Sequence, residues 1–363
     1  MTRQSFSGRA AIAGIGMTEI TRASGVTPLD LALTASRAAL DEAGIDRPDA
    51  ILSYHLNDSA PVLYLARSLG MDEIGWHNEI YGGGTQCASI LADAAMLVAS
   101  GLAENVLVYR ALNGRSGRRM NTLGLKLGEG TEEQFTHPYG MAGPVHQFAL
   151  AAQRYLHDRG LTENHLAEVV IRSRANGAAN PRALVRKPMT LEDYRAEPMI
   201  ASPLRRSDCC QETDAGCALV VTGPRPGAPR IHAVVRGGGS GCSTMDKAED
   251  VTRIFAHYVA DRLWEAAGMK PADIGSALLY DAYSWLVPRQ LEDFGLLARE
   301  DLKDGLSAAL DRVNPHGGLL SEGYVHGLNN TAEAVRRVRA TGVPALVTGF
   351  GGSYGSAAVL TPG

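Results

Sequence analysis

One glycine-rich run near the end of the chain, NPHGGLLSEGYVHGLNN, concentrates side chains that could do chemistry. It carries His316, Glu322, Tyr324, His326 and Asn330 between glycines. Polar groups crowded into a turn-rich segment between regular elements are typical of functional sites, because loops held by a rigid scaffold carry function. Imidazoles and phenols both donate hydrogen bonds and transfer protons. The run therefore predicts part of an active site.

A second candidate is Tyr280-Asp281-Ala282-Tyr283, which ends the apolar run SALL and could bring phenols to the same crevice. A free phenol has a pKa of about 10, so it serves as a base only if its neighbours lower that value. As an acid it works readily. This strand end is therefore a candidate source of acid or base groups.

Cys87 is a candidate nucleophile because it follows Gly82-Gly83-Gly84 at the start of a long helical pattern. Backbone amides and the helix dipole at such a terminus lower the pKa of a thiol. The alternative is a small buried residue one turn inside a core helix. The remaining cysteines, with Cys242 among them, form no CxxC pair, so neither structural zinc nor another metal site is expected. Three of them are interpreted as packing residues: Cys209, Cys210 and Cys217.

Two short motifs match catalytic signatures only by letters. Gly14-Ile15-Gly16 follows an expected strand, but Glu19 stands where a dinucleotide-binding fingerprint needs its third glycine. The run 351–355 reads GGSYG and fits GxSxG, yet no Asp, Glu or His follows it. An α/β-hydrolase needs both after its serine, so a glycine-rich turn is the better interpretation.

Composition excludes several classes of protein. The 363 residues hold 35 Lys and Arg against 39 Asp and Glu, a net charge of −4, whereas a dedicated nucleic-acid binder shows a basic excess. There is no apolar stretch of 18 residues to span a membrane and no signal-peptide core at the start. The five cysteines form no evenly spaced framework. We therefore expect a cytoplasmic protein.

The elements that must position these groups alternate between strand and helix, which favours a largely parallel, covered sheet. Each half has an amphipathic helix ending in DEAG or EAAG, then a short Pro/Asp loop and a core strand. We interpret this as a duplicated βαβ-type unit. Expected strands cover 10–16, 50–54, 104–112, 230–236 and 276–283, and expected helices cover 29–44, 86–101 and 250–267.

The duplication predicts two halves, 1–225 and 226–363. A stretch over about 113–200, rich in Gly, Arg and His, interrupts the alternation and is interpreted as an inserted loop region over one face.

Six segments together resemble the thiolase superfamily, in its branch of sterol-carrier-protein and lipid-transfer-protein type enzymes. The resemblance covers nearly the whole chain and implies a duplicated five-layer α-β-α-β-α fold, in agreement with the repeat. The segments are GGGTQCASILADAAMLVASGLAENVLV, PYGMAGPVHQFALAAQRYLHDRG, SPLRRSDCCQETDAGCALVVT, YDAYSWLVPRQLEDFGLL, GGLLSEGYVHGLNNTAEAVRRVR and GFGGSYGSAAVL.

Departures from the thiolase pattern change the expected chemistry. Counted back from Gly101, the thiolase nucleophile position falls on Gly84; Tyr324 replaces the catalytic histidine, and Gly349 the second cysteine. The tyrosine pattern resembles the thiolase-like aldolases of steroid side-chain breakdown. That resemblance implies retro-aldol cleavage of a β-hydroxyacyl-CoA, with a coenzyme A ester as substrate and no covalently bound cofactor or acyl-enzyme.

Roles follow for the candidate residues. We expect Tyr324 and Tyr280 to share the proton transfers, with Asp281 orienting or hydrogen-bonding one phenol. The enolate oxygen requires preorganised donors, and the candidates are the His326 imidazole and backbone N–H groups near Gly84, Gly351 and Gly352.

Two other functions remain open from the sequence alone. One is a C-acyltransferase that uses Cys87 with His55, His146 or His326 as base, and the other is a non-catalytic CoA- or lipid-binding subunit. The family resemblance also implies a homodimer and a small partner protein that joins a zinc ribbon to an OB-fold.

Overall fold

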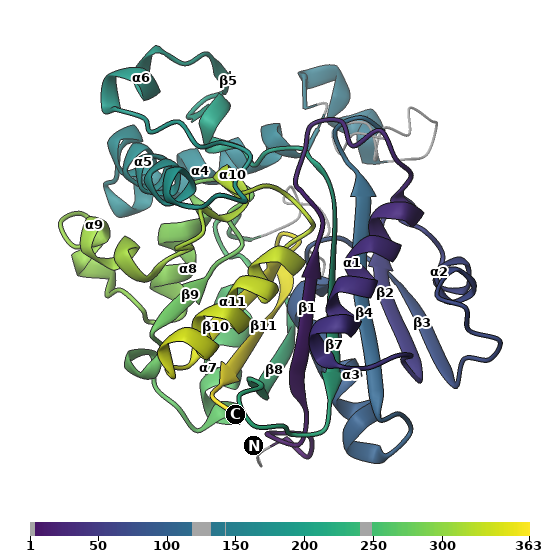
Figure 1. Ribbon diagram of the computed structural model, residues 1–363. Coiled ribbons are helices and arrows are strands. Elements are labelled where there is room, and N and C mark those ends of the chain that lie inside the picture. The colour runs from purple at the N-terminus through teal and green to yellow at the C-terminus, as the bar shows by residue number, and fades with distance from the viewer. Residues whose placement is uncertain (1–3, 118–131, 142, 240–248) are drawn as a thin grey trace.

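The computed structural model describes residues 4–117, 132–141, 143–239 and 249–363 (Figure 1). Its strands follow the order β3-β2-β4-β7-β1-β8-β11-β10-β9, and the two halves of the chain join where Ala11 of β1 pairs with Arg230 of β8. The strands are β1 (Ala11–Met17), β2 (Ala50–His55), β3 (Trp76–Tyr81), β4 (Asn105–Asn113), β7 (Asp214–Thr222), β8 (Arg230–Gly238), β9 (Ser276–Leu278), β10 (Ala345–Phe350) and β11 (Tyr354–Thr361).

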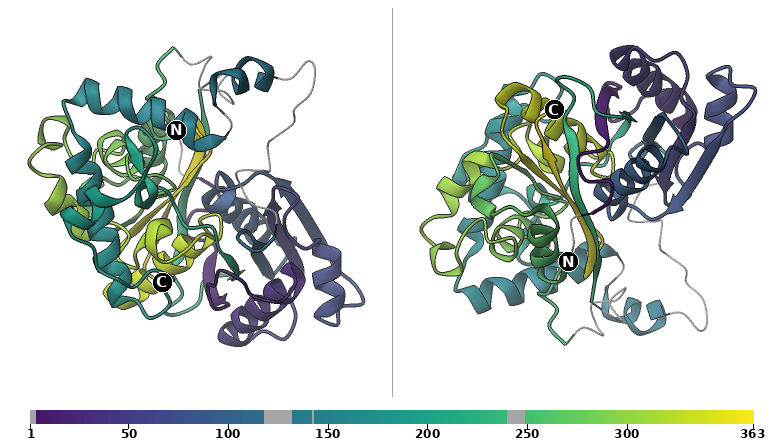
Figure 2. Two further views of the ribbon diagram at one scale, coloured as in Figure 1. Left: turned by 90° about the horizontal axis from the view of Figure 1, so that it is seen from above. Right: turned by 90° about the horizontal axis from the view of Figure 1, so that it is seen from below.

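The helices complete five layers. α3 (Gln86–Ser100) and α11 (Leu328–Thr341) lie between the halves, because each packs against strands of both. α1 (Pro28–Ala43) covers β1, β4 and β7 from outside, and α7 (Phe255–Ala267) covers β8 and β11. Figure 2 shows the purple and blue N-terminal half beside the green and yellow C-terminal half. The predicted five-layer α-β-α-β-α fold is confirmed. The expectation of a largely parallel sheet was wrong, because among the described residues β1, β7, β8 and β11 pair with their neighbours antiparallel and only β2–β3, β2–β4 and β9–β10 pair parallel.

Local sequence explains these elements. Thr27 and Asp30 form a capping box at the start of α1, and Gly44 ends that helix in the left-handed conformation. A Cβ on Gly14 or Gly16 would lie 2.1 or 2.0 Å from a carbonyl oxygen of α1. The Gly-x-Gly motif therefore lets β1 and α1 pack closely, and this packing explains it without a dinucleotide.

The segment between β4 and β7 differs from the expected loop region. Its described part is mainly helical, because proline and threonine start its helices and Gly160 ends one of them in the left-handed conformation. It contains α4 (Pro144–Arg159), α5 (Glu163–Ala179), α6 (Leu191–Ala196) and a hairpin of β5 (Met199–Ala201) with β6 (Leu204–Arg205). The prediction of a loop over 113–200 was wrong for these residues.

Short helices and turns complete the C-terminal half. They are α8 (Leu286–Asp293), α9 (Leu306–Ala309) and α10 (Gly318–Ser321), while α2 (Val62–Ser68) lies beside β3 in the N-terminal half. The expected half boundary at 225/226 falls in the turn between β7 and β8. Among the helices of the described ranges, none is long and apolar enough to cross a membrane.

Candidate active site

The two predicted phenols meet in the interior. The hydroxyls of Tyr280 and Tyr324 are 2.7 Å apart, and their rings pack edge to face with centroids 6.2 Å apart. Only 2% of Tyr280 and 6% of Tyr324 is exposed. Burial raises the pKa of both phenols well above the usual value, so both carry protons at neutral pH. A phenol can act as a free phenolate base only if its pKa is lowered, and neither Tyr280 nor Tyr324 meets this condition.

Side chains hold the backbone on both sides of Tyr280, which is why β9 ends at Leu278 rather than continuing to residue 283 as expected. The Tyr280 N–H donates to Thr348 Oγ1 at 2.8 Å, and its carbonyl accepts from Gln290 Nε2 at 2.9 Å. Tyr324 is held in the same way, since Thr213 Oγ1 bonds both its N–H and its carbonyl, at 3.0 and 2.8 Å. The phenols are therefore positioned by rigid backbone.

Glycine at position 84 makes room for the Tyr280 phenol. A Cβ on Gly84 would lie 2.1 Å from Tyr280 Oη. A Cβ on Gly349 would lie 2.9 Å from the Cys87 sulfur and 2.5 Å from the Gly84 carbonyl oxygen. Both positions that the resemblance assigns to thiolase cysteines thus face the same interior site, and a phenol occupies the space that a side chain at 84 would need.

The expected anion-binding amides at 351 and 352 are only partly available. The Gly351 N–H donates to the Tyr354 carbonyl at 3.1 Å, so the prediction of a free donor there was wrong for this conformation. The Gly352 carbonyl accepts from the Phe255 N–H at 3.0 Å, and Gly352 has a left-handed φ of 95°.

His326 lies beside the phenol pair, with its ring centroid 4.8 Å from that of Tyr324. Its Nδ1 is 2.9 Å from Nε of Arg110, whose Nη2 pairs with Asp58 at 2.6 Å. Burial and the neighbouring guanidinium lower the pKa of His326 to about 3, so the ring is neutral. Arg110 and Asp58 are not among the site residues predicted from the sequence. A lone arginine inside the apolar strand VLVYRAL was the available signal, because a fully buried arginine needs a partner.

Asp281 does not bond either phenol in the structure. Its carboxylate accepts from the backbone N–H of Leu319 at 2.8 Å and of Leu320 at 3.4 Å, at the start of α10. Burial raises its pKa to about 6. The expectation that Asp281 hydrogen-bonds a phenol was therefore wrong, and its contacts anchor the turn that leads to Tyr324.

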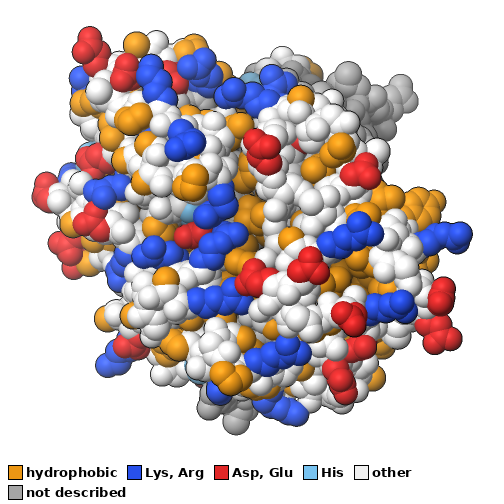
Figure 3. All heavy atoms as spheres, viewed as in Figure 1, with side chains coloured by type: hydrophobic (Ala, Val, Ile, Leu, Met, Phe, Trp, Pro, Cys, Tyr) orange, Lys and Arg blue, Asp and Glu red, His pale blue; other side chains and the backbone are white. Residues whose placement is uncertain are grey.

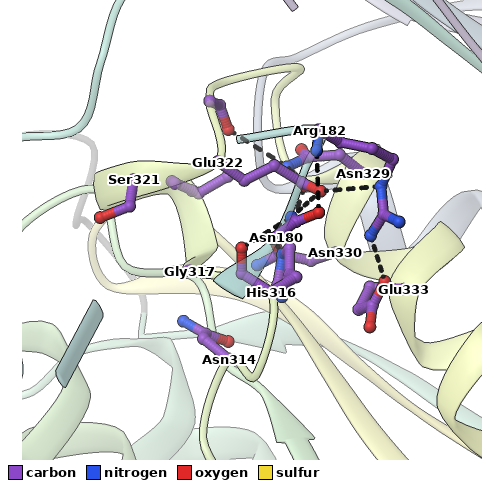
Figure 4. Close-up of polar contacts among 12 residues, drawn as sticks. Asn180, Arg182, Asn314, His316, Gly317, Ser321, Glu322, Asn329, Asn330 and Glu333 are labelled. Carbon is purple, nitrogen blue, oxygen red and sulfur yellow. Dashed lines mark hydrogen bonds and ion pairs between the residues drawn. The ribbon is translucent and has the colours of Figure 1, made fainter. Parts of the chain in front are cut away.

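The remaining polar residues of the C-terminal run form a separate buried network (Figure 4). Glu322 accepts hydrogen bonds from Asn180 and Asn329, both at 3.0 Å, and from Arg182 at 3.3 Å. His316 bonds Asn330 at 3.1 Å. The residues that were predicted to form one site therefore belong to two. Tyr324 and His326 lie in the phenol site, whereas His316, Glu322 and Asn330 stabilise the adjacent loop.

Cys87 has the environment of a packing residue. Its side chain is fully buried, its sulfur lies 3.4 Å from the Thr348 carbonyl oxygen, and burial raises the pKa of the thiol. Within the described ranges no histidine hydrogen-bonds this thiol: His55 lies 3.8 Å from Glu79, and His146 contacts the Gly143 carbonyl. The predicted lowering of the thiol pKa is therefore reversed. Cys242 lies outside the described residues.

Among the described residues, no group of three or more His, Cys, Asp or Glu side chains is arranged to hold a metal ion. Fold and site together define a thiolase-like α/β protein with two buried phenols, one after the end of β9 and one in the loop before α11, and a buried thiol of raised pKa.

Comparison with known proteins agrees with this class. The profile of the thiolase C-terminal domain-like family matches residues 237–360. The chain is 36% identical to the 17-hydroxy-3-oxo-4-pregnene-20-carboxyl-CoA lyase of Mycobacterium tuberculosis, over 93% of both chains. It is 37% identical to the steroid side-chain-cleaving aldolase of Thermomonospora curvata, over 93% of this chain and 92% of that one. A solved structure described as Ltp2-ChsH2(DUF35) aldolase aligns with a TM-score of 0.90 at 35% identity, over 99% of both chains.

The chain therefore belongs to the thiolase superfamily, in the branch that contains the steroid side-chain-cleaving aldolases. It is a carbon–carbon lyase of the aldolase type on a thiolase fold.

Proposed function

We propose that this lyase cleaves a β-hydroxyacyl-CoA ester of a steroid by a retro-aldol reaction, releasing a ketone or aldehyde and a shorter acyl-CoA. The observation that carries the proposal is the pair of protonated phenols 2.7 Å apart, Tyr280 and Tyr324. The names of the two relatives, which specify a steroid side chain and a carboxyl-CoA lyase, support the substrate class.

A relay through both phenols balances the protons. As the bond between Cα and Cβ breaks, the β-hydroxyl proton passes to one phenol oxygen, and that phenol passes its own proton to the other. The second phenol protonates the enolate carbon, so both end as they began. High phenol pKa values suit this relay, because no free phenolate is required. The enolate oxygen needs a donor in the meantime, and the His326 imidazole beside Tyr324 supplies it.

The direct test is an assay of carbon–carbon cleavage on a panel of β-hydroxyacyl-CoA esters, with steroid and short-chain members. We expect release of a ketone or aldehyde and a shorter acyl-CoA in equal amounts, with the steroid esters cleaved faster. Transfer of an acyl group without release of a carbonyl product would contradict the proposal.

The Cys87→Ala variant distinguishes a lyase mechanism from an acyltransferase mechanism. We expect kcat/KM for cleavage to stay within about threefold of the wild type, because the thiol is buried and protonated. The free energy of unfolding should fall by about 1 kcal/mol or less, since little apolar volume is removed. Intact-protein mass spectrometry after incubation with an acyl-CoA should show no adduct on the wild type. An acyl adduct at Cys87 would point to the transferase instead.

We also propose a homodimer formed at the open edge of the N-terminal half. β3 ends the strand order, and its Trp76 and Tyr81 are 45% and 68% exposed. On the neighbouring α2, Leu63 and Tyr64 are 52% and 63% exposed. Figure 3 shows a group of hydrophobic side chains on this side of the molecule, with Lys, Arg, Asp and Glu side chains around it. An exposed apolar strand edge is a template for pairing with a second chain.

Light scattering should therefore give twice the monomer mass for the wild type. Tyr64→Glu combined with Tyr81→Glu should give a monomer, because it places charges within the apolar edge. The matched control is Leu191→Glu, at a 36% exposed leucine on α6, which should stay dimeric. A monomer mass for the wild type would contradict the proposed homodimer.

A zinc-ribbon and OB-fold partner protein and a cytoplasmic location complete the proposal. The description of the solved relative names a DUF35 component with its aldolase, which supports a partner. The described cysteines Cys87, Cys209, Cys210 and Cys217 are free thiols, as in a reducing compartment. Co-purification with a zinc-containing subunit would test the partner.

A further inference from the structure

The ring of His326 is fully buried, yet only one of its nitrogens has a partner. Nδ1 lies 2.9 Å from Arg110 Nε and 2.6 Å from Arg110 Nη2. Nε2 has no hydrogen-bond partner among the described residues, and a Cβ on Gly83 would lie 3.4 Å from it. Leaving a buried polar group unpaired costs about 1–3 kcal/mol. An unpaired ring nitrogen next to the phenol site therefore indicates where an acceptor atom of a ligand belongs.

The chemistry of Arg110 determines which nitrogen of His326 carries the proton. A guanidinium offers five N–H donors and no acceptor, and it stays protonated in proteins. A proton on His326 Nδ1 would oppose two N–H groups at hydrogen-bond distance. Nδ1 must therefore be the acceptor, and the single proton of the neutral ring lies on Nε2.

Both partners are held so that this pairing persists. Arg110 is fully buried, its Nη2 pairs with Asp58 at 2.6 Å, and its Nη1 donates to the Ala111 carbonyl at 2.8 Å. The backbone of His326 has a left-handed φ of 48°, and its carbonyl accepts from Tyr54 Oη at 3.0 Å. Two charged groups shift the pKa of His326 in opposite directions: Arg110 lowers it and Asp58 raises it.

We propose that Arg110, held by Asp58, is a positioning residue that keeps His326 neutral with its proton on Nε2, directed at the oxygen of the thioester enolate. This inference deepens the proposed retro-aldol function and rests on it. Neutrality matters because an imidazolium would give its proton to the enolate oxygen and compete with protonation at carbon. A neutral imidazole N–H stabilises the same oxygen by a hydrogen bond and keeps its proton.

The assignment can be read directly in the free wild-type enzyme. In a protein labelled with ¹⁵N-histidine, and with the His326 signals identified by loss in His326→Gln, we expect a protonated Nε2 and an unprotonated Nδ1. The pattern should not change between pH 5 and 9. A proton on Nδ1, or a ring that titrates within this range, would overturn the inference whatever the activity of the enzyme.

The catalytic consequence can be measured without the steroid. In D₂O with acetyl-CoA and a small carbonyl acceptor such as acetone, the enzyme should exchange the α-protons of the thioester through the enolate, because the relay run in reverse passes the α-proton to the carbonyl oxygen of the acceptor. Mass spectrometry detects the exchange. Arg110→Met combined with Asp58→Leu removes both charges together, which avoids a buried unpaired ion. This double variant should lose about 10- to 100-fold in kcat for exchange, as supporting residues typically do, with KM nearly unchanged. His326 should then show both tautomers and titrate closer to its ordinary pKa.

Two further variants complete the test. Arg110→Lys keeps a cationic donor near Nδ1, so it should retain the Nε2–H tautomer and most of the exchange rate. Arg159→Met is the matched control, because Arg159 is largely buried and pairs with Glu292 at 2.7 Å outside the site; its exchange rate should be that of the wild type. A wild-type exchange rate in the Arg110/Asp58 double variant would overturn the inference. Absence of exchange in the wild type would instead count against the proposed function, while the nitrogen spectrum still decides the tautomer.

Discussion

Tyr324→Phe should lower kcat for carbon–carbon cleavage by about 10²- to 10⁴-fold, the range for loss of a general acid or base. The substitution removes one hydroxyl from the 2.7 Å pair and leaves the buried ring in place. KM should change little, because the relay operates in the transition state. The free energy of unfolding should fall by no more than about 1–3 kcal/mol, the cost of leaving the Tyr280 hydroxyl unpaired. Steady-state kinetics and denaturant unfolding measure the two effects.

Comparison with Tyr280→Phe and the double variant tests whether the phenols act as one relay. If each proton passes through both hydroxyls, removing either breaks the chain, and the double variant should be no slower than the slower single variant. The matched control is Tyr155→Phe, since the Tyr155 ring is fully buried and its hydroxyl bonds Glu292 at 3.1 Å away from the site. It should cleave at the wild-type rate. A near-wild-type rate for Tyr324→Phe would remove this residue from the mechanism.

Elements set by local chemistry could be predicted from the sequence. The expected helices at 29–44 and 86–101 lie within one or two residues of α1 and α3, because a capping threonine, a proline or a terminal glycine marks their ends. The duplication was visible because each half repeats the same helix, loop and strand signals. The helical insertion was missed although Gly160 and the threonine caps mark it, since its Gly, Arg and His content was interpreted as loop.

The site could be predicted only in part, for a physical reason. Tyr280 follows a strand and Tyr324 lies in a polar run, so each stood out by its own surroundings. Arg110 reaches His326 across 216 residues of sequence, and this contact exists only once β4 lies beneath the loop at 326. Whether the pKa of each phenol is raised or lowered also depends on burial, which the motif does not show. Contacts between distant segments therefore decide the chemistry that local pattern leaves open.

Gly84→Ala should lower kcat for cleavage as much as loss of a phenol does, although it adds only a single uncharged methyl group. The new Cβ would lie 2.1 Å from Tyr280 Oη and 2.2 Å from its Cζ, so the ring must move and the bond to Tyr324 must break. Backbone conformation is not the obstacle, because Gly84 is not among the glycines with positive φ. Overpacking of this kind costs about 1–3 kcal/mol of stability, which a protein of this size survives.

We therefore expect kcat to fall by about 10²-fold or more in Gly84→Ala, with a cooperative unfolding transition retained. Gly223→Ala is the matched control, because a Cβ there would meet no atom within 4 Å, and both its rate and its stability should match the wild type. Gly84→Cys places a thiol at the position that thiolases use. It should also lose cleavage without gaining acyl transfer, because Tyr324 stands where the resemblance places the catalytic histidine and the phenol of Tyr280 fills the space that the sulfur needs. Wild-type cleavage by Gly84→Ala would mean that the phenol pair is free to rearrange and that its close packing is not required for the reaction.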